Sequence, residues 1–328
     1  MFGASEPRLP TVPTAHLDDL RGRVDVARLR MDVERLDEPR GRPHAPEAME
    51  RAERYVTAQL EAAGWAVRRR PFAVGLAGVN LLATAPPGRD GLPVGAVAGG
   101  PARLIVGAHL DTVPGSPGAD DNASGVAALL ELARVVPPTP DVTLAVFDQE
   151  ETGLHGSRVL AKELVAADRR PSGVIVFECI GYTAAAPGSQ RLPPGLDLLY
   201  RGQARRMRSR EFRGEWTIIL YRQDARTLAT TFGAGLAHLA GRPAVMFARD
   251  PIDLPLLGPV LGRLAPLVRD FARSDHKPFW DLGIPAIQVT DTANFRNPHY
   301  HQPTDTPETL DYDRIADIVA ATAALTTT

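Results

Sequence analysis

The sequence predicts an open α/β sheet with helices on both faces, and its apolar pattern is the main reason. Three short apolar runs, at Leu104–Ala108, Val142–Phe147 and Val174–Phe177, have the length and the β-branched content of buried strands. Two segments of helix length, Ser124–Val136 and Gly156–Ala167, alternate with these runs along the chain. Fully apolar strands separated by helices are typical of parallel strands that are covered on both faces.

Elements on either side extend this pattern. Apolar residues spaced three and four apart predict an amphipathic helix over Pro46–Trp65, and short strands are expected from Ala66 and around Val79–Ala85. Further along the chain we expect a strand at Trp216–Tyr221, a helix at Ala225–Ala240, a proline-punctuated helical stretch at Pro251–Phe271, an inner strand at Ala286–Thr290 and a closing helix at Asp313–Leu325.

The chain of 328 residues is predicted to form one globular domain over residues 15–328, preceded by a flexible arm at residues 1–14. The arm is rich in proline and turn-forming residues. Residues 183–213 combine prolines and glycines with six arginines between Arg201 and Arg213. We expect this segment to be a lid or a surface excursion within the domain.

The composition narrows the function. Hydrophobic residues make up 44% of the chain and charged residues 23%, as in ordinary globular proteins. The formal net charge of -2 predicts no nucleic-acid partner and no binding to an anionic membrane. Cys179 is the only cysteine, which excludes an intrachain disulfide and a cysteine-based zinc site. No run approaches the ~20 apolar residues of a membrane helix, and no signal peptide is visible, so we expect a cytoplasmic protein.

Potential metal ligands follow the ends of the three central strands. In an open α/β sheet, functional groups gather just past the carboxyl ends of the strands. The candidate segments are His109-Leu-Asp111, Gly118-Ala-Asp120-Asp121-Asn122, Asp148-Gln-Glu150-Glu151, Glu178 and, far downstream, His299-Tyr-His301. Imidazole nitrogen and carboxylate oxygen suit zinc, and cobalt or manganese could use the same ligands.

Local geometry suggests roles for some of these side chains. In a strand, His109 and Asp111 point to the same face, so Asp111 could orient His109 by accepting its second N–H. Asp120 lies at the turn into a helix, where its short side chain could bridge two ions about 3.5–4 Å apart.

The adjacent pair Glu150-Glu151 also indicates a metal. Two adjacent carboxylates repel each other, and burying both raises at least one pKa unless a cation compensates. One glutamate would bind the ion, and the other would accept a proton from a water molecule that the ion acidifies. These residues therefore favour a metal-dependent hydrolase.

Five segments together resemble the dinuclear zinc aminopeptidases of metallopeptidase family 28. They are Gly107–Asp111, Pro117–Gly125, Glu150–Ser157, Ser274–His276 and Tyr300–Thr306, and they keep the family's order along the chain. The resemblance implies a single domain with a mixed, mostly parallel central sheet and helices on both faces. It also implies an enzyme that releases N-terminal residues from peptides or small amides with two zinc ions per chain.

The resemblance assigns the metal ligands by position. His109 and Glu178 would bind one zinc ion, Glu151 and His301 would bind the other, and Asp120 would bridge the two.

Other site residues follow from the same resemblance. Glu150 resembles the general base, and Asp111 resembles the partner that orients His109. Ser274 and Asp275 would support the metal site from behind.

The sequence departs from the family's pattern at two positions. Glu178 stands where secreted aminopeptidases of the family usually carry aspartate. Phe271 lies where some members have an aromatic hydroxyl that could stabilise the oxyanion, and Tyr182, Tyr300 and His276 are candidate substitutes.

Two other readings of the function stay open. A related metal-dependent enzyme, such as a carboxypeptidase, a deacylase or a glutaminyl cyclase, could use the same scaffold. A catalytically inactive binding protein could keep the same fold, although the presence of Glu150 favours an enzyme.

Overall fold

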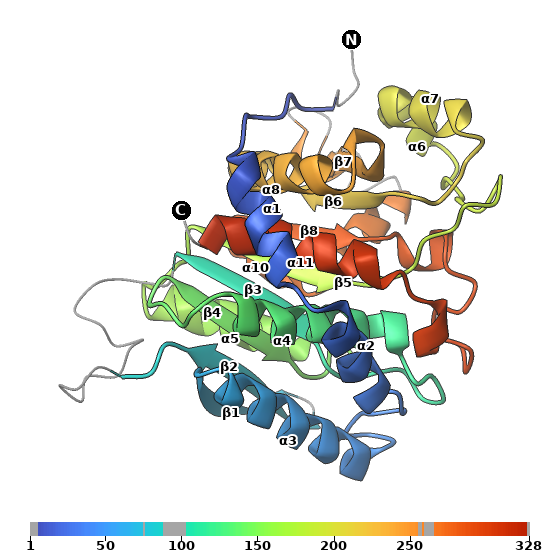
Figure 1. Ribbon diagram of the computed structural model, residues 1–328. Coiled ribbons are helices and arrows are strands. Elements are labelled where there is room, and N and C mark those ends of the chain that lie inside the picture. The colour runs from blue at the N-terminus through green and yellow to red at the C-terminus, as the bar shows by residue number, and fades with distance from the viewer. Residues whose placement is uncertain (1–5, 75, 88–102, 255–257, 259–265, 327–328) are drawn as a thin grey trace.

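A central sheet organises the chain. A computed structural model describes residues 6–74, 76–87, 103–254, 258 and 266–326. Within these residues, eight strands form one sheet in the order β1-β2-β4-β3-β5-β8-β6-β7 (Figure 1). The strands are β1 (Ala66–Val74), β2 (Leu76–Thr84), β3 (Leu104–His109), β4 (Val142–Phe147), β5 (Gly173–Glu178), β6 (Thr217–Tyr221), β7 (Val245–Arg249) and β8 (Ala286–Thr290).

The sheet is mixed, with a parallel centre. Strands β4, β3, β5 and β8 are parallel neighbours, and β6 and β7 form a further parallel pair. The pairs β1–β2, β2–β4 and β6–β8 are antiparallel. The prediction of one α/β domain with a mixed, mostly parallel sheet is confirmed.

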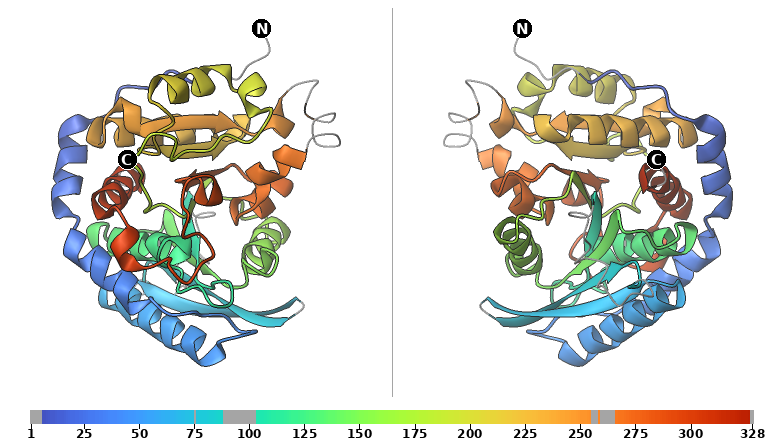
Figure 2. Two further views of the ribbon diagram at one scale, coloured as in Figure 1. Left: turned by 90° about the vertical axis from the view of Figure 1, so that its right-hand side faces the viewer. Right: turned by 90° about the vertical axis from the view of Figure 1, so that its left-hand side faces the viewer.

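Helices cover both faces of this sheet, as Figure 2 shows. They are α1 (Thr14–Arg23), α2 (Val26–Arg35), α3 (Pro46–Ala62), α4 (Gly125–Val135), α5 (His155–Ala166), α6 (Leu196–Leu199), α7 (Arg201–Ser209), α8 (Arg226–Leu239), α10 (His276–Asp281) and α11 (Tyr312–Thr326). Helices α1, α2, α3, α4, α8 and α11 pack on one face, and α5 and α10 pack on the other.

The alternation of side chains along β5 illustrates how the two faces fill. Ile175 and Phe177 join the hydrophobic core under α4 and α11, whereas Val174 and Val176 join the core under α5 and α10. All four side chains are fully buried. Because both faces of the strand are covered, the run is apolar throughout, which is the pattern that made it recognisable in the sequence.

The central elements lie where the sequence predicts them. The predicted strands at 142–147 and 286–290 have those same bounds in β4 and β8. Strand β3 extends one residue beyond the predicted end, and β5 extends one residue beyond the prediction at each end. The helices predicted at 46–65, 124–136, 156–167, 225–240 and 313–325 correspond to α3, α4, α5, α8 and α11.

Several elements were not predicted from the sequence. No element was assigned to residues 15–45, yet α1 and α2 lie there and bury Leu17, Leu20, Leu29 and Val33. The local signal for α2 was Asp25, whose side chain accepts hydrogen bonds from the main chain at the start of the helix, a common N-cap. The edge strand β7 was also missed, and residues 183–213 contain the two helices α6 and α7.

Some predictions fall partly outside the described residues. Of the predicted arm at residues 1–14, residues 6–13 contain no helix or strand, and residues 1–5 are outside the description. The helical stretch predicted at 251–271 contains the 3-10 turn Pro251–Asp253 and most of the 3-10 turn Pro266–Ala272. Its residues 255–257 and 259–265 lie outside the described part of the chain. Among the described residues, no helix has both the length and the apolar character needed to span a membrane.

A buried arginine holds the loop that leads from β3 toward α4. Arg40 is fully buried, and its guanidinium donates to the carbonyl oxygens of Leu110 (2.7 Å), Pro117 (2.6 Å) and Gly118 (3.1 Å). Burial lowers its pKa to about 10, so the side chain is still charged at neutral pH. Because a buried main-chain carbonyl needs a donor, Arg40 fixes both ends of this loop.

Replacing Arg40 should therefore destabilise the fold strongly. Arg40→Met leaves several buried carbonyl oxygens without their donor, and we expect a loss of at least about 3 kcal/mol in the free energy of unfolding. Urea denaturation monitored by circular dichroism measures this loss as a lower midpoint. The matched control is Arg51→Met, which removes an exposed pair with Glu38 and should leave the urea midpoint close to that of the native chain. Equal losses in the two variants would contradict the role given to Arg40.

Candidate metal centre

Three parallel neighbours bring the candidate ligands to one edge of the sheet. Strand β3 ends at His109, β5 ends at Glu178, and β4 ends just before the segment Asp148–Glu151. The order β4-β3-β5 makes these three carboxyl ends adjacent. The helical turn Ala119–Ser124 and the loop around His301 reach the same edge.

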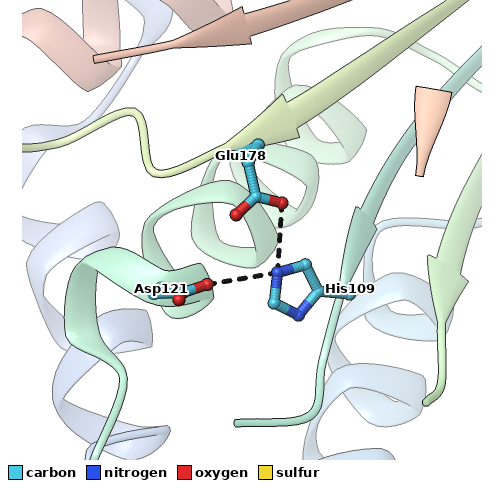
Figure 3. Close-up of side chains that lie close together, drawn as sticks. All are labelled: His109, Asp121 and Glu178. Carbon is cyan, nitrogen blue, oxygen red and sulfur yellow. Dashed lines mark ion pairs between the residues drawn. The ribbon is translucent and has the colours of Figure 1, made fainter. Parts of the chain in front are cut away.

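Two groups of side chains converge there, and they share one aspartate. In the first group, His109 Nε2 lies 3.2 Å from Asp121 Oδ1 and 3.2 Å from Glu178 Oε2 (Figure 3). In the second, His301 Nε2 lies 2.9 Å from Asp121 Oδ2 and 3.4 Å from Glu151 Oε2. The two oxygens of Asp121 therefore face two different imidazoles.

These separations are compatible with a common ion in each group. Tetrahedral zinc with ligand bonds of about 2.0–2.1 Å places neighbouring ligand atoms roughly 3.3 Å apart. The four observed separations range from 2.9 to 3.4 Å. Among the described residues, His109 Nε2, His301 Nε2 and Asp121 Oδ1 are buried and have no hydrogen-bond partner. Each group could hold one divalent cation.

The expectation that Asp120 bridges the two ions is corrected by this geometry, because Asp121 occupies that place. Asp120 points elsewhere: Oδ1 accepts from the main-chain N–H of Gly181 at 2.9 Å, and Oδ2 accepts from Asn297 Nδ2 at 2.8 Å. Burial and then the nearby carboxylate of Asp291 raise the pKa of Asp120 well above its usual value. The sequence places both aspartates in one turn, and nothing in that run of residues says which of the two faces the histidines.

Asp111 supports the site in a different way from the one expected. His109 Nδ1 donates to the main-chain oxygen of Asp111 at 3.0 Å, whereas the nearest carboxylate oxygen is 3.8 Å away. The carboxylate instead accepts from the main-chain N–H groups of Glu150 (3.0 Å) and Glu151 (3.1 Å). A main-chain carbonyl is a common partner for a metal-binding histidine. Asp111 thus orients His109 through its backbone and positions the glutamate pair through its side chain.

Ser274 and Asp275 lie behind Glu178. Ser274 Oγ donates to Glu178 Oε2 at 2.7 Å, which fixes the oxygen that faces His109. Asp275 is fully buried, and burial raises its pKa to about 7. Of these two residues, Ser274 makes the direct hydrogen bond to Glu178, and Cys179 Sγ donates to the other oxygen of Glu178 at 3.3 Å.

A second carboxylate holds the turn that carries Asp121. Asp305 accepts from the main-chain N–H groups of Asp120 at 3.0 Å and Asp121 at 3.1 Å. Asp305 belongs to the segment Tyr300–Thr306, so it ties the turn to the loop that supplies His301. The sequence pattern at Tyr300–Thr306 indicates a functional segment, but it contains no local signal for this role of Asp305.

The buried acidic groups need positive charge nearby. Burial raises the pKa of Glu150 well above its usual value, and it raises the pKa of Glu151 to about 7. For His109, burial favours the neutral ring, but Glu178 and Glu150 outweigh that effect and raise its pKa. Similarly, Asp121 and Glu151 outweigh burial at His301 and raise its pKa to about 10. A set of buried carboxylates that draws protons onto its histidines is suited to binding cations in their place.

A cavity of about 370 Å³ opens from this edge. Glu150, Glu151, Glu178 and His301 line one part of it. Apolar and polar side chains line the remainder, and the apolar ones include Leu192, Pro193, Leu196, Met207, Trp216, Ile218, Leu220 and Phe271. Four of these come from residues 183–213, so the segment of uncertain role in the sequence forms one wall of the cavity.

The family is decided by comparison with known sequences. Residues 94–224 and 262–326 match the model of peptidase family M28, and together they make up more than half of the chain. The chain belongs to peptidase family M28. The resemblance drawn from the five sequence segments is thereby confirmed.

Individual relatives match this chain over part of their own length. Protein YfbL of Escherichia coli (strain K12) is 35% identical over 231 residues, which cover 66% of this chain and 64% of YfbL. Aminopeptidase YwaD of Bacillus subtilis (strain 168) is 29% identical over 237 residues, which cover 67% of this chain and 40% of YwaD. The chain thus spans less than two thirds of the length of these relatives.

Solved structures share the fold. The LapA aminopeptidase of Legionella pneumophila superposes with a TM-score of 0.67 at 16% identity, covering 98% of this chain and 76% of LapA. The aminopeptidase from Aneurinibacillus sp. strain AM-1 superposes with a TM-score of 0.63 at 18% identity, covering 94% of this chain and 95% of the aminopeptidase. The glutaminyl cyclase of Porphyromonas gingivalis superposes with a TM-score of 0.63 at 16% identity, covering 93% of this chain and 99% of the cyclase. Two aminopeptidases and a glutaminyl cyclase therefore share the fold of this chain.

Exchanging each aspartate in turn tests which of them faces the ions. Asp121→Asn should reduce the zinc content toward zero, because one amide oxygen cannot serve both groups. Asp120→Asn disturbs two buried hydrogen bonds and should lower the midpoint of urea unfolding, while the folded protein keeps its zinc. Elemental analysis after dialysis gives the metal-to-protein ratio of each variant. Loss of zinc in Asp120→Asn together with retention of zinc in Asp121→Asn would show that Asp120 is the shared ligand.

Proposed function

We propose that this chain is a two-zinc aminopeptidase that releases N-terminal residues from peptides or small amides. One observation carries the proposal: Asp121 is shared between two ligand groups, and their members Glu151, Glu178 and His301 line a cavity together with Glu150. His109 and Glu178 would hold one ion, and Glu151 and His301 would hold the other. Two zinc ions bound in this way would supply Lewis acidity, which lowers the pKa of water from about 15.7 toward about 7 and polarises a carbonyl oxygen.

Glu150 is the proposed general base. It lines the cavity, is only 8% exposed and, within the described residues, belongs to neither ligand group. Its main-chain N–H is held by the carboxylate of Asp111, so its backbone has a fixed position beside Glu151. Glu150 accepts a proton from the attacking water and then delivers that proton to the nitrogen of the leaving amine.

The shape and charge of the cavity favour a substrate with a free amine. Glu178 and Glu151 lie at the part of the cavity where the scissile bond would sit. A protonated N-terminal amine would meet carboxylates there, whereas an acylated nitrogen would leave them without that partner. The apolar wall that includes Leu196, Met207 and Trp216 suits a large apolar side chain on the N-terminal residue.

A substrate panel tests the proposal against its alternatives. The panel contains leucine, phenylalanine, lysine and glutamate p-nitroanilides, N-acetyl-leucine p-nitroanilide, N-acetyl-leucine, a C-terminally unblocked acylated peptide and a peptide with N-terminal glutamine. We expect the leucine and phenylalanine anilides to be cleaved with the highest kcat/KM and the N-acetylated compounds to be at least ~100-fold poorer, as expected when a charged contact is lost. Turnover of only N-blocked substrates, or cyclisation of glutamine alone, would contradict the aminopeptidase proposal.

Glu150→Gln is the matched control for this panel. It is close in size to the native residue and cannot accept the proton, so kcat should fall by about 10²–10⁴-fold while the zinc content stays near that of the native chain. The comparison also excludes a contaminating peptidase, since such activity would persist in the variant. Parallel loss of zinc and activity would place Glu150 among the metal ligands and refute its assignment as base.

A further inference from the structure

Gln288 places a carboxamide group on the wall of the cavity. It belongs to β8, which lies between β5 and β6 in the sheet (Figure 1). Its neighbours along the strand, Ile287 and Val289, join the core on the opposite face, so the side chain of Gln288 points to the cavity face. Gln288 lines the cavity and is only 7% exposed, so its carboxamide is nearly buried before any ligand enters.

The strand register sets how far Gln288 lies from the ligand edge of the sheet. Thr290 pairs with Glu178, and Gln288 pairs with Val176, one same-face position earlier along these parallel strands. Two successive positions on one face are about 6.6 Å apart along a strand. Gln288 therefore lies farther from the ligand edge than Glu178 does, at a distance suited to the far end of a substrate side chain.

The surroundings of this carboxamide are apolar. Leu220 lies directly opposite Gln288 on β6, and it lines the cavity together with Leu196 and Phe271. These three side chains belong to one hydrophobic cluster on this face of the sheet. Among the described residues, none hydrogen-bonds the carboxamide of Gln288. A buried amide without a partner costs free energy, so this amide is suited to a polar group that arrives with a ligand.

Other polar side chains on the cavity wall already have partners. Gln190 Oε1 accepts from Arg296 Nε at 2.8 Å, and Gln190 Nε2 donates to Thr292 Oγ1 at 3.0 Å. Ser274 Oγ donates to Glu178 Oε2 at 2.7 Å. These groups are committed to the protein, whereas the carboxamide on β8 still has donors and an acceptor to offer.

We propose that Gln288 determines the specificity of the cavity and selects N-terminal tyrosine, whose phenol hydroxyl donates a hydrogen bond to Gln288 Oε1. The inference rests on the proposed aminopeptidase function and names its substrate class. A tyrosine side chain is apolar up to its terminal oxygen, so its ring suits the apolar wall and its hydroxyl meets the amide. A glutamine side chain fits less well, because its carboxamide has more hydrogen-bonding positions than Gln288 can fill.

The preference arises from the group that a purely apolar side chain would leave unpaired. A phenylalanine ring fills the same apolar space and removes water from the carboxamide, but it offers no hydrogen bond in return. A site that hydrogen-bonds a substrate hydroxyl therefore rejects the analogue that lacks it.

Two substrates of nearly equal shape test this preference. Tyrosine p-nitroanilide and 4-methylphenylalanine p-nitroanilide carry a hydroxyl and a methyl group at the same place, so the depth of the cavity affects both alike. The native chain should cleave the tyrosine substrate with a kcat/KM at least about 10-fold higher. Gln288→Met keeps the length of the side chain and removes the amide. It should lower kcat/KM for the tyrosine substrate and raise kcat/KM for the methyl analogue, which brings their ratio to about one or below.

Control measurements separate specificity from structure. Gln223→Met makes the same exchange at an exposed position that is not among the described residues lining the cavity, and it should keep the native ratio. The zinc content of Gln288→Met should equal that of the native chain. Its midpoint of urea unfolding should be at least as high, because the exchange removes a buried amide that has no partner among the described residues.

Equal kcat/KM for the two matched substrates in the native chain would overturn the inference alone, provided that leucine p-nitroanilide is cleaved. A tyrosine preference that survives in Gln288→Met would also overturn it, as would a variant that fails to fold, since Gln288 would then be a structural residue. A higher kcat/KM for glutamine p-nitroanilide than for the tyrosine substrate would overturn the choice of a phenol. A native chain that cleaves none of the aminoacyl substrates would overturn the inference together with the proposed function.

Discussion

The carboxylate of Asp121 lies between two imidazoles, 3.2 Å from His109 Nε2 on one side and 2.9 Å from His301 Nε2 on the other. Glu178 and Glu151 complete the two groups, so several acidic side chains share a region with little access to water. Two like charges about 4 Å apart repel by roughly 4 kcal/mol at an effective dielectric constant near 20. Such an arrangement is stable only if cations or protons compensate it, and divalent cations do so while leaving the carboxylates ionised.

Buried hydrogen bonds from distant segments hold the turn that carries Asp121 and the segments next to it. Asp305 binds the main chain of the turn that carries Asp121, and Arg40 binds the carbonyl oxygens of the loop that precedes the turn. Asp111 links His109 to the backbone of the glutamate pair. These contacts join segments that are far apart in the chain. Cation binding is thus coupled to the packing of the loops at the carboxyl edge of the sheet.

The parts of this arrangement that could be predicted from the sequence are those with a local signal. Strands β3, β4 and β5 are apolar on both faces, and the ligand types at their ends indicated a metal site. The choice between Asp120 and Asp121 had no local signal, because it depends on contacts with Gly181, Asn297 and the two histidines.

Other features escaped prediction for the same reason. Arg40 acts through carbonyl groups that lie 70 to 78 residues away along the chain, which no spacing rule indicates. The support of His109 comes from a backbone oxygen of Asp111, which any residue could provide. The helices α1 and α2 are short, and their buried positions are defined by packing on α4, α8 and α11.

The most direct measurement of the central claim is the anomalous scattering of a crystal of the zinc-loaded protein at the zinc edge. The account predicts two peaks about 3.5–4 Å apart, one beside each oxygen of the Asp121 carboxylate. One peak should lie within bonding distance of His109 and the other within bonding distance of His301. A single peak, or a pair bridged by Asp120, would contradict it.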